Sequence, residues 1–407
     1  MRLMMAPLAF LEELRQQHGD LFTIHPAQGD PLVIVGSPEL IKEVCTASPR
    51  VLHTGEANRI LNSFLGPKAM ILLDGERHME RRKILLPQFR GNHAKRYEST
   101  MREMAEAEIA DWPPDSEQAA WPRMQRIALS VIMCVIFGEE AETRLAPLCE
   151  AIRQLHAVSA PPGERVGGDS LSTAVRNANE MIAAEVAQRR ADCETDRHND
   201  VLALLLDATY EDGSSLSEAE LRDELLMLLM AGHETIAMSL TWTLERLARA
   251  PDVLARTAAE AQEGGGPYTE AVIYETLRMR PVVPGFMRLV KEPFQLGDYL
   301  LPPGTAIAAS VLLVHHRPDI YPDPGVFRPE RFLKRPPDTY TWIPFGGGVR
   351  RCLGAVFAML EMRVVLSTLL ARTSIHARGP EPEAMRNLAL MLTPSRGGRI
   401  VLAPRAR

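Results

Sequence analysis

FGGGVRRCLG, residues 345–354, places one cysteine, Cys352, after a glycine-rich turn and immediately before a predicted amphipathic helix. The unpaired N–H groups and partial positive charge of a helix N-terminus favour the deprotonated sulfur, which is the form that binds metals. The glycines would let a flat cofactor lie against the backbone, which side chains would prevent. The stretch therefore predicts a thiolate ligand beside a flat cofactor. For Cys352 taken alone, a buried cysteine in a nucleotide-binding loop is the alternative.

The longest predicted helix begins after Ser217 and ends at Ala250. Ser217 and Glu220 form a capping-box pattern, and Pro251 stops the run. At ~1.5 Å per residue the helix is roughly 48 Å long. Its centre, Leu225–Met230, is apolar on every face, which predicts that it is buried on all sides.

A short polar break follows within this helix. Ala231-Gly232-His233-Glu234-Thr235 introduces a glycine, an acid and a hydroxyl, which are costly in a buried helix unless they have partners. The break therefore indicates a functional position. A helix kink, in which Thr235 hydrogen-bonds back to the carbonyl four residues earlier, is the alternative.

The chain as a whole has the composition of an ordinary globular protein, with 407 residues of which 46% are hydrophobic and 24% charged. A short β-type run at residues 32–35 precedes helical patterns from Pro38 to Ala250, and no internal repeat is present. After Arg280, short strands with many prolines lead to a final helix at about residues 353–371. We expect one domain, mainly α with small β-sheets at its edge.

Charge and hydropathy exclude several classes. The net charge of -6 gives no overall attraction to nucleic acid. The apolar opening, Met1–Phe10, has about half of the ~20 residues that a membrane span needs, and it lacks the features of a secretory leader. Five cysteines without CxxC spacing argue against a disulfide framework. We expect a cytoplasmic protein without a membrane anchor and without a nucleic-acid partner.

The full pattern Phe-x-x-Gly-x-Arg-x-Cys-x-Gly, filled by Phe345, Gly348, Arg350, Cys352 and Gly354, resembles the haem-binding signature of the cytochrome P450 family. The resemblance runs from about residue 7 to residue 404. It implies a single cytochrome P450 domain over residues 1–407, with a helical body, a long central helix and a β-rich edge. It also implies haem b (iron protoporphyrin IX), with Cys352 as the axial ligand of the iron. Phe345 would pack beside the thiolate, Arg350 would face a propionate, and Gly346 and Gly354 would lie in the cofactor-binding loop.

The polar break matches the family's acid-alcohol pair. By this resemblance Glu234 and Thr235 deliver protons during the activation of dioxygen, which is general acid chemistry. Gly232, next to Ala231, removes a side chain where oxygen must sit. These four residues are the predicted catalytic residues.

Two further motifs are predicted to build the cofactor pocket. Glu275 and Arg278, three residues apart on one helical face, match the family's ExxR pair, and Arg331 matches the partner of that pair. The resemblance assigns these three residues to pocket integrity rather than to chemistry.

His78 and Arg82, four residues apart on one predicted helix, can hold a carboxylate. By resemblance they bind the haem propionates, together with Arg288 and Arg350. Arg77, Arg81 and Lys83 are instead predicted to form a solvated basic face. The predicted docking patch for an electron donor consists of these exposed cations: Arg77, Arg81, Lys83, Arg90 and Arg351.

The predicted reaction is a monooxygenation. The family resemblance implies that O2 is activated with two electrons and that an apolar organic substrate is hydroxylated or epoxidised. The sequence has no flavin or nicotinamide fingerprint, so a separate ferredoxin or flavodoxin with its reductase is the expected donor. The expected substrate is a fatty acid, terpenoid, steroid or polyketide. Pocket-lining candidates, half of which are expected to be ordinary core, are Leu61, Phe64, Met227, Val283, Phe286, Met391 and Leu392.

Two rival functions fit the same cofactor. One is a haem-thiolate enzyme with a different reaction, such as peroxygenation, C–C coupling or isomerisation. The other is a haem-binding sensor or carrier without turnover. Glu234 and Thr235 argue against both, because a peroxide-driven site commonly dispenses with such a pair and a sensor or carrier without turnover has no use for proton delivery.

Overall fold

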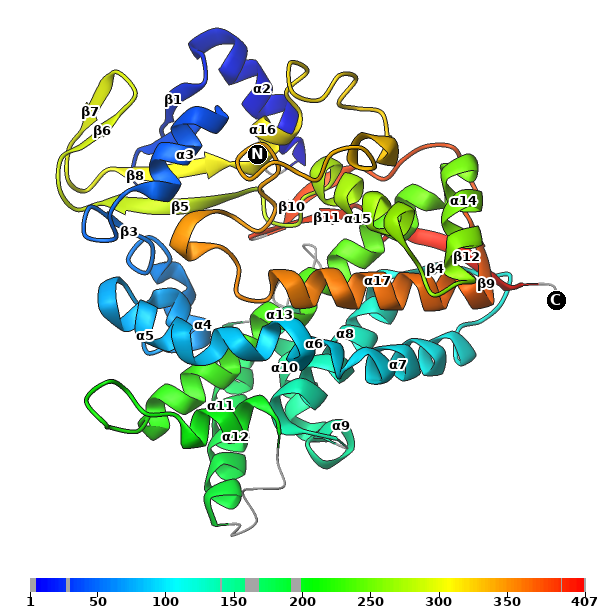
Figure 1. Ribbon diagram of the computed structural model, residues 1–407, viewed down its shortest axis with the longest axis horizontal. Coiled ribbons are helices and arrows are strands. Elements are labelled where there is room, and N and C mark those ends of the chain that lie inside the picture. Colours follow the sequence, from blue (N-terminus) through cyan, green and yellow to red (C-terminus); the bar gives the residue numbers. More distant parts are fainter. Residues whose placement is uncertain are drawn as a thin grey trace. The chain divides into compact units, whose positions relative to one another are not determined.

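The computed structural model describes residues 5–26, 30–139, 141–157, 168–191, 199–388 and 390–405. These residues form two compact units. Unit 1 comprises Met1–His53, Glu98–Ile127 and Thr235–Arg407, and unit 2 comprises Thr54–Tyr97 and Ala128–Glu234. Most described residues are helical and the sheets are small, which confirms the predicted fold class (Figure 1). A single domain over residues 1–407 stays a prediction.

Unit 1 contains every sheet of the described residues. Its largest sheet has five strands in the order β1-β2-β8-β5-β3. Their bounds are β1 Leu21–Ile24, β2 Leu32–Val35, β8 Ala306–Ser310, β5 Gly285–Val290 and β3 Leu52–His53. Strand β2 is parallel to β8, and the other neighbours are antiparallel. The β-type run predicted at residues 32–35 is therefore confirmed, and Val35, Val290 and Ile307 pack in the hydrophobic core beside this sheet.

Three smaller sheets complete unit 1. They are β4-β12-β9, β10-β11 and β6-β7, all antiparallel. The bounds are β4 Glu117–Ala119, β12 Arg399–Pro404, β9 Thr373–His376, β10 Met385–Leu388, β11 Met391–Pro394, β6 Phe294–Leu296 and β7 Tyr299–Leu301. The helices of this unit are α2 Pro7–His18, α3 Pro38–Thr46, α7 Glu98–Ala110, α14 Pro251–Ala261, α15 Pro267–Met279, α16 Val311–His315 and α17 Ala355–Arg372. The 3-10 turns are η5 Pro329–Phe332 and η6 Gly348–Arg350.

The described part of unit 2 consists mainly of helices, with one isolated antiparallel bridge between Thr209 and Ser215. The helices are α4 Asn62–Leu65, α5 Gly75–Leu85, α6 Gly91–Lys95, α9 Ala141–Arg144, α10 Ala146–Ala157, α11 Gly168–Ala191 and α12 Val201–Asp207, with the 3-10 turns η1 Arg59–Leu61, η2 Met70–Leu72 and η3 Leu86–Phe89. Buried ion pairs hold some of them, because Arg189 on α11 contacts Asp200 at 2.9 Å and donates to the carbonyl of Phe137. Helix α8, Trp121–Phe137, and helix α13, Glu218–Leu247, each continue from one unit into the other.

Helix α13 begins with the predicted capping box. The Ser217 amide donates to the Glu220 carboxylate at 2.9 Å, and the Glu220 amide donates to the Ser217 hydroxyl at 3.3 Å. The helix ends at Leu247, three residues before the predicted end. Arg249 and Ala250 form tighter bonds to carbonyls three residues back, and Ala250 serves as the N-cap of α14, whose first residue is Pro251.

Helix α13 is also the one described helix that is long and apolar enough to cross a membrane. However, 78% of its most apolar window is buried inside the protein, as in a core helix. The burial predicted for its centre is confirmed from Leu225 to Leu229.

The final helix, α17, confirms the prediction with a shift of its first residue. It begins at Ala355 rather than at residue 353, because Gly354 occupies the N-cap position. Cys352 therefore lies just before the first turn of this helix.

Candidate active site

The cysteine loop connects Ile343 to α17 through a series of backbone hydrogen bonds. The Gly346 amide donates to the Ile343 carbonyl at 3.0 Å, the Arg351 amide donates to the Gly348 carbonyl at 3.1 Å, and the Cys352 amide donates to the Phe345 carbonyl at 2.9 Å. These bonds fold the loop back on itself and leave the Cys352 side chain exposed. The loop thus presents a sulfur atom at the start of a helix, where thiolate is favoured.

Glycine is needed in this loop for two different physical reasons. A Cβ atom at Gly347 would lie 2.8 Å from Cys45 Sγ, and one at Gly348 would lie 2.0 Å from the Cys45 carbonyl oxygen, so these glycines let α3 approach the loop. The sequence assigned all of them to the cofactor, and for these two the contact with Cys45 is a packing reason that the sequence did not reveal. At Gly354 a Cβ atom would meet nothing within 4 Å.

The open space at Gly354 beside the exposed sulfur of Cys352 is the observation that fits a flat cofactor with a thiolate ligand. Two cations of the same unit suit the acidic groups of such a cofactor. Arg288 on β5 is buried and its guanidinium lies 5.1 Å from the centre of the Phe286 ring, while Arg350 is half-buried in η6. The donor set of unit 1 therefore fits a haem.

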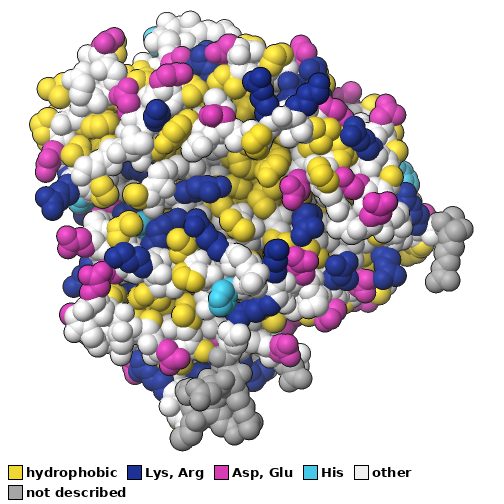
Figure 2. Space-filling view, viewed as in Figure 1, with side chains coloured by type: hydrophobic (Ala, Val, Ile, Leu, Met, Phe, Trp, Pro, Cys, Tyr) yellow, Lys and Arg dark blue, Asp and Glu magenta, His cyan; other side chains and the backbone are white. Residues whose placement is uncertain are grey.

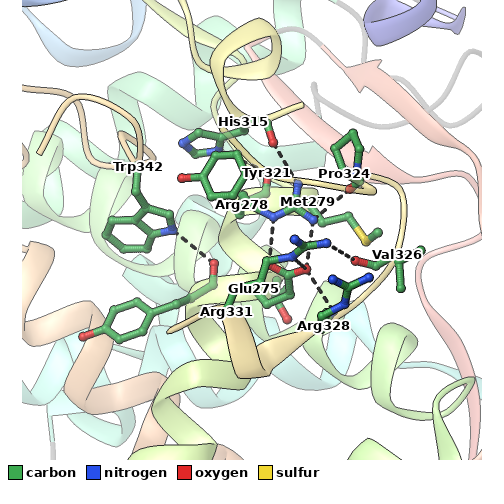
Figure 3. Close-up of polar contacts among 12 residues, drawn as sticks. Glu275, Arg278, Met279, His315, Tyr321, Pro324, Val326, Arg328, Arg331 and Trp342 are labelled. Carbon is green, nitrogen blue, oxygen red and sulfur yellow. Dashed lines mark hydrogen bonds and ion pairs between the residues drawn. The ribbon is translucent and has the colours of Figure 1, made fainter. Parts of the chain in front are cut away.

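The predicted ExxR network is present and buried (Figure 3). Arg278 donates two hydrogen bonds to the Glu275 carboxylate, at 2.8 and 2.9 Å, and both side chains have no exposed surface. Arg331 donates to the same carboxylate at 3.3 Å, and the Arg328 amide donates to it at 2.9 Å. Because the charges are paired and buried together, removing one partner would leave another uncompensated.

The remaining predicted residues lie in or next to unit 2. His78 is buried and Arg82 is half-buried on α5, four residues apart as predicted. On α13, Glu234 is buried, Ala231 is exposed and Thr235 is half-buried. The carbonyl of Thr235 accepts a hydrogen bond from the Ser239 hydroxyl at 2.7 Å.

Gly232 has a packing reason that the sequence did not reveal. A Cβ atom there would lie 2.9 Å from Ile132 Cδ1 on α8. The absent side chain therefore leaves space for Ile132, and the prediction that it leaves space for oxygen gains no support from this contact.

The sequence model of the family described as cytochrome P450 matches residues 2–401. The chain is 38% identical over 408 residues to a Mycobacterium tuberculosis protein provisionally named cytochrome P450 135B1, covering 97% of this chain and 86% of the relative. It is 36% identical over 400 residues to another protein of that organism, provisionally named cytochrome P450 138, covering 96% of this chain and 90% of the relative. The chain belongs to the cytochrome P450 family.

Solved P450 structures share the fold. The cyanobacterial CYP120A1, solved with retinoic acid bound, superimposes with a TM-score of 0.85 at 25% identity, covering 97% of this chain and 94% of that one. The haem domain of cytochrome P450DA gives the same TM-score of 0.85 at 23% identity, covering 98% and 92%. The predicted P450 fold is confirmed, and the chain is a cytochrome P450 monooxygenase. The family has a haem-thiolate cofactor and uses O2, a substrate and redox partners.

Arg81 corrects the predicted basic face of this P450. It was predicted to be solvated, but only 1% of its side chain is exposed. It contacts Glu224 at 2.9 Å and Glu220 at 3.1 Å, and it donates to the Tyr210 hydroxyl. A buried arginine needs such partners, so Arg81 is part of the interior of unit 2 and is removed from the predicted docking patch.

The two carboxylates beside Arg81 differ in charge behaviour. Burial opposes ionisation of Glu220, but hydrogen bonds from Ser217 and Tyr210 and the charge of Arg81 lower its pKa to about 2. Burial raises the pKa of Glu224 to about 7, although Arg81 and the Met70 amide oppose this shift. Glu224 is therefore the carboxyl of this pair that titrates near neutral pH.

The other patch residues are exposed. Arg77, Lys83 and Arg90 are exposed in unit 2, and Arg351 is exposed in unit 1. Lys83 contacts Glu211 at 3.0 Å, and Figure 2 shows acidic side chains interspersed with basic ones on the visible face. A common patch formed by these residues stays a prediction.

The predicted substrate-lining residues have different environments. Leu61 and Phe64 are half-buried, Met227 is buried and Val283 is 37% exposed. Phe286 packs against the core beside the five-stranded sheet, and Met391 packs near Trp242. Leu392 has no exposed surface and packs with Leu312 and Leu313, so it is the ordinary core residue that the sequence left as an alternative.

Sequence reasoning missed His315, which is fully buried beside the ExxR pair. Its imidazole contacts the Arg278 carbonyl through Nδ1 at 3.1 Å and accepts a hydrogen bond from the Ile343 amide at Nε2, at 2.9 Å. The signal in the sequence was a histidine that follows the apolar run Val311–Val314, since an ionisable residue at such a position needs partners.

Proposed function

We propose that this P450 monooxygenase binds haem b through Cys352 and hydroxylates or epoxidises an apolar organic substrate of the fatty acid, terpenoid, steroid or polyketide type. The observation that carries the proposal is the exposed Cys352 side chain, held by the folded loop at the start of α17. A haem with a thiolate ligand supplies reductive activation of dioxygen.

Four basic side chains would hold the cofactor's two carboxylates. Arg288 and Arg350 in unit 1, and His78 and Arg82 in unit 2, are the proposed partners. Charge-assisted hydrogen bonds to carboxylates are strong when the groups are partly buried, as these are.

Glu234 and Thr235 are proposed to move protons toward the reacting oxygen. A buried carboxyl and a neighbouring hydroxyl give one group that can release a proton and one that can both accept and donate it. Glu234 is buried and Thr235 is half-buried on the same helix.

The proposed substrate class is supported by the composition of the lining residues and by one solved neighbour. The proposed lining residues Leu61, Phe64, Met227, Val283, Phe286 and Met391 are all apolar, and the cyanobacterial neighbour was solved with retinoic acid, a largely apolar ligand. A ferredoxin or flavodoxin with its reductase is the proposed electron donor, and the cytoplasm is the proposed location.

The deciding experiment is the absorption spectrum of the reduced protein with carbon monoxide, for wild type and Cys352→Ser. We expect the red-shifted Soret band of a thiolate-ligated haem in wild type and its loss in the variant. A histidine-type spectrum, or an unchanged spectrum in Cys352→Ser, would overturn the assignment of Cys352. Product analysis with reductant and with peroxide then separates the monooxygenase from a peroxide-driven enzyme.

A further inference from the structure

His315 lies between the buried ExxR pair and the segment that enters the cysteine loop. Its backbone carbonyl accepts a hydrogen bond from Arg278 Nη1 at 2.8 Å, and its Nδ1 contacts the Arg278 carbonyl at 3.1 Å. Helix α16 is thus joined to α15 by a reciprocal pair of bonds on the same two residues. Figure 3 shows the His315 ring to the upper left of the Arg278 guanidinium, with Trp342 further to the left.

The other ring nitrogen of His315 reaches the cysteine-loop segment. The Ile343 amide donates to Nε2 at 2.9 Å, and the Ile343 carbonyl in turn accepts the Gly346 amide at 3.0 Å. The neighbouring residue Trp342 is held to α15 as well, because its indole N–H donates to the Tyr274 carbonyl at 3.1 Å. Two consecutive residues before the loop are therefore fixed from two helices.

The two contacts of the ring determine its tautomer. Nδ1 faces a carbonyl and must donate, while Nε2 faces an amide N–H and must accept, so only the neutral imidazole with a proton on Nδ1 satisfies both. Burial, with the nearby charges of His316 and Arg278, lowers the pKa of His315 well below its ordinary value, which keeps this form at all physiological pH values.

We propose that His315 is a positioning residue for Cys352: by bridging Arg278 to the Ile343 amide, it fixes the start of the cysteine loop and thereby the place of the sulfur. The inference rests on the proposed role of Cys352 as the iron ligand. A buried amide that loses its partner pays a large desolvation penalty, so the loop segment without this acceptor would shift to find another partner or water.

The test compares substitutions at two adjacent buried histidines. His315→Phe keeps an aromatic ring but removes the acceptor for Ile343, whereas His315→Gln keeps an acceptor at a similar distance along the side chain. His316→Phe is the matched control, because His316 is also buried, with 5% of its surface exposed, and its Nδ1 contacts the Leu312 carbonyl of the preceding turn.

Two measurements on the haem-loaded proteins are needed. The first is the ratio of the blue-shifted band to the thiolate-type band of the reduced carbon monoxide complex. The second is amide hydrogen exchange of the segment 342–352, which does not depend on the spectrum. For His315→Phe we expect the band ratio and the exchange rate to rise roughly tenfold, because the loss of one buried hydrogen bond produces a change of that size. For His315→Gln we expect both quantities to return toward wild-type values.

Wild-type values in His315→Phe, or an equal change in His316→Phe, would overturn the positioning role while leaving Cys352 as the ligand. A wild-type protein without a thiolate-type band would instead overturn the proposed function itself. If His315→Phe fails to fold, His315→Asn takes its place, because its shorter side chain keeps a donor near the position of Nδ1 but has no acceptor at the position of Nε2. Wild-type exchange of segment 342–352 in His315→Asn would then overturn the positioning role.

Discussion

Position 348 leaves no room for a side chain. Gly348 has a φ of +64°, and a Cβ atom would lie 2.0 Å from the Cys45 carbonyl oxygen, a backbone atom that cannot rotate away. We expect Gly348→Ala to lower the unfolding free energy by about 3 kcal/mol, from left-handed strain and overpacking together. Thermal unfolding measures this. Gly325→Ala, where a Cβ atom would meet nothing within 4 Å, is the control and should change stability by less than ~0.5 kcal/mol.

Gly232 permits a test that separates a packing role from a role at the cofactor. Because a Cβ atom at Gly232 would lie 2.9 Å from Ile132 Cδ1, Gly232→Ala should destabilise by ~1 kcal/mol despite its better helix propensity. The cost should be relieved in the background of Ile132→Ala, with a coupling of ~1 kcal/mol in a double-mutant cycle of thermal unfolding. Additive effects would show that Gly232 is required for another reason.

At the residue scale, the sequence could predict residues whose chemistry is unusual for their position. Cys352 stood out because it follows a glycine-rich turn and precedes a helix, and Glu275 and Arg278 stood out because they match the family's ExxR motif. Cys45 and His315 did not, since their roles depend on which backbone atoms face them. Such contacts join residues that are far apart in the sequence, and no local pattern encodes them.

At the element scale, the first turns of α13 anchor the segment before α5. Asp223 accepts the Lys68 amide at 2.9 Å, and Glu224 accepts the Met70 amide at 3.1 Å. The capping box that starts this helix was predictable, because its partners are three residues apart. The burial of Arg81 was not, because its acidic partners lie more than a hundred residues away.

This anchor makes a prediction about pH. The folded-state pKa of Glu224, about 7, lies above its ordinary value of 4.5, so between these pH values the folded protein holds a proton that the unfolded chain has released. The contribution of Glu224 to the unfolding free energy is therefore fully present below pH 4.5 and is lost as the pH rises through 7. From pH ~5 to ~7, wild type should lose ~2 kcal/mol of unfolding free energy relative to Glu224→Gln.

Other groups make the comparison with Glu224→Gln necessary. His316, whose pKa burial lowers to about 3, contributes in the opposite direction over part of the same range. Glu220, with a pKa of about 2, acts only at more acidic pH. The difference between wild type and Glu224→Gln isolates the one carboxyl, and parallel pH profiles of the two proteins would contradict its assignment.

At the scale of the whole molecule, the family could be predicted because the P450 motifs occur in the family's order along one chain. The family model matches residues 2–401. The high helix content could be predicted from hydrophobic periodicity. The division into two compact units could not be predicted from the sequence, because each unit combines segments from distant parts of the chain. Hydrophobic periodicity reports which face of a helix is buried, and it carries no information on which distant helix covers that face.

Electron delivery gives the prediction that belongs to this scale. The protein has a net charge of -6, so an acidic ferredoxin would be repelled unless local cations steer it. Arg77 and Lys83 are exposed on α5 and are the proposed steering residues. In Arg77→Glu/Lys83→Glu, the rate of reduction by reduced ferredoxin should fall roughly tenfold at low ionic strength, and the difference should shrink as salt screens it.

The control for this prediction is Lys334→Glu/Arg335→Glu, because both residues are exposed and the change in net charge is the same. If both double variants slow reduction equally, the effect belongs to the overall charge and not to α5. If only Arg77→Glu/Lys83→Glu slows it, the donor approaches α5, and the corrected patch without Arg81 is sufficient. Stopped-flow reduction at several salt concentrations distinguishes these outcomes, because steering by a local patch changes the association rate and leaves the electron-transfer step within the complex unchanged.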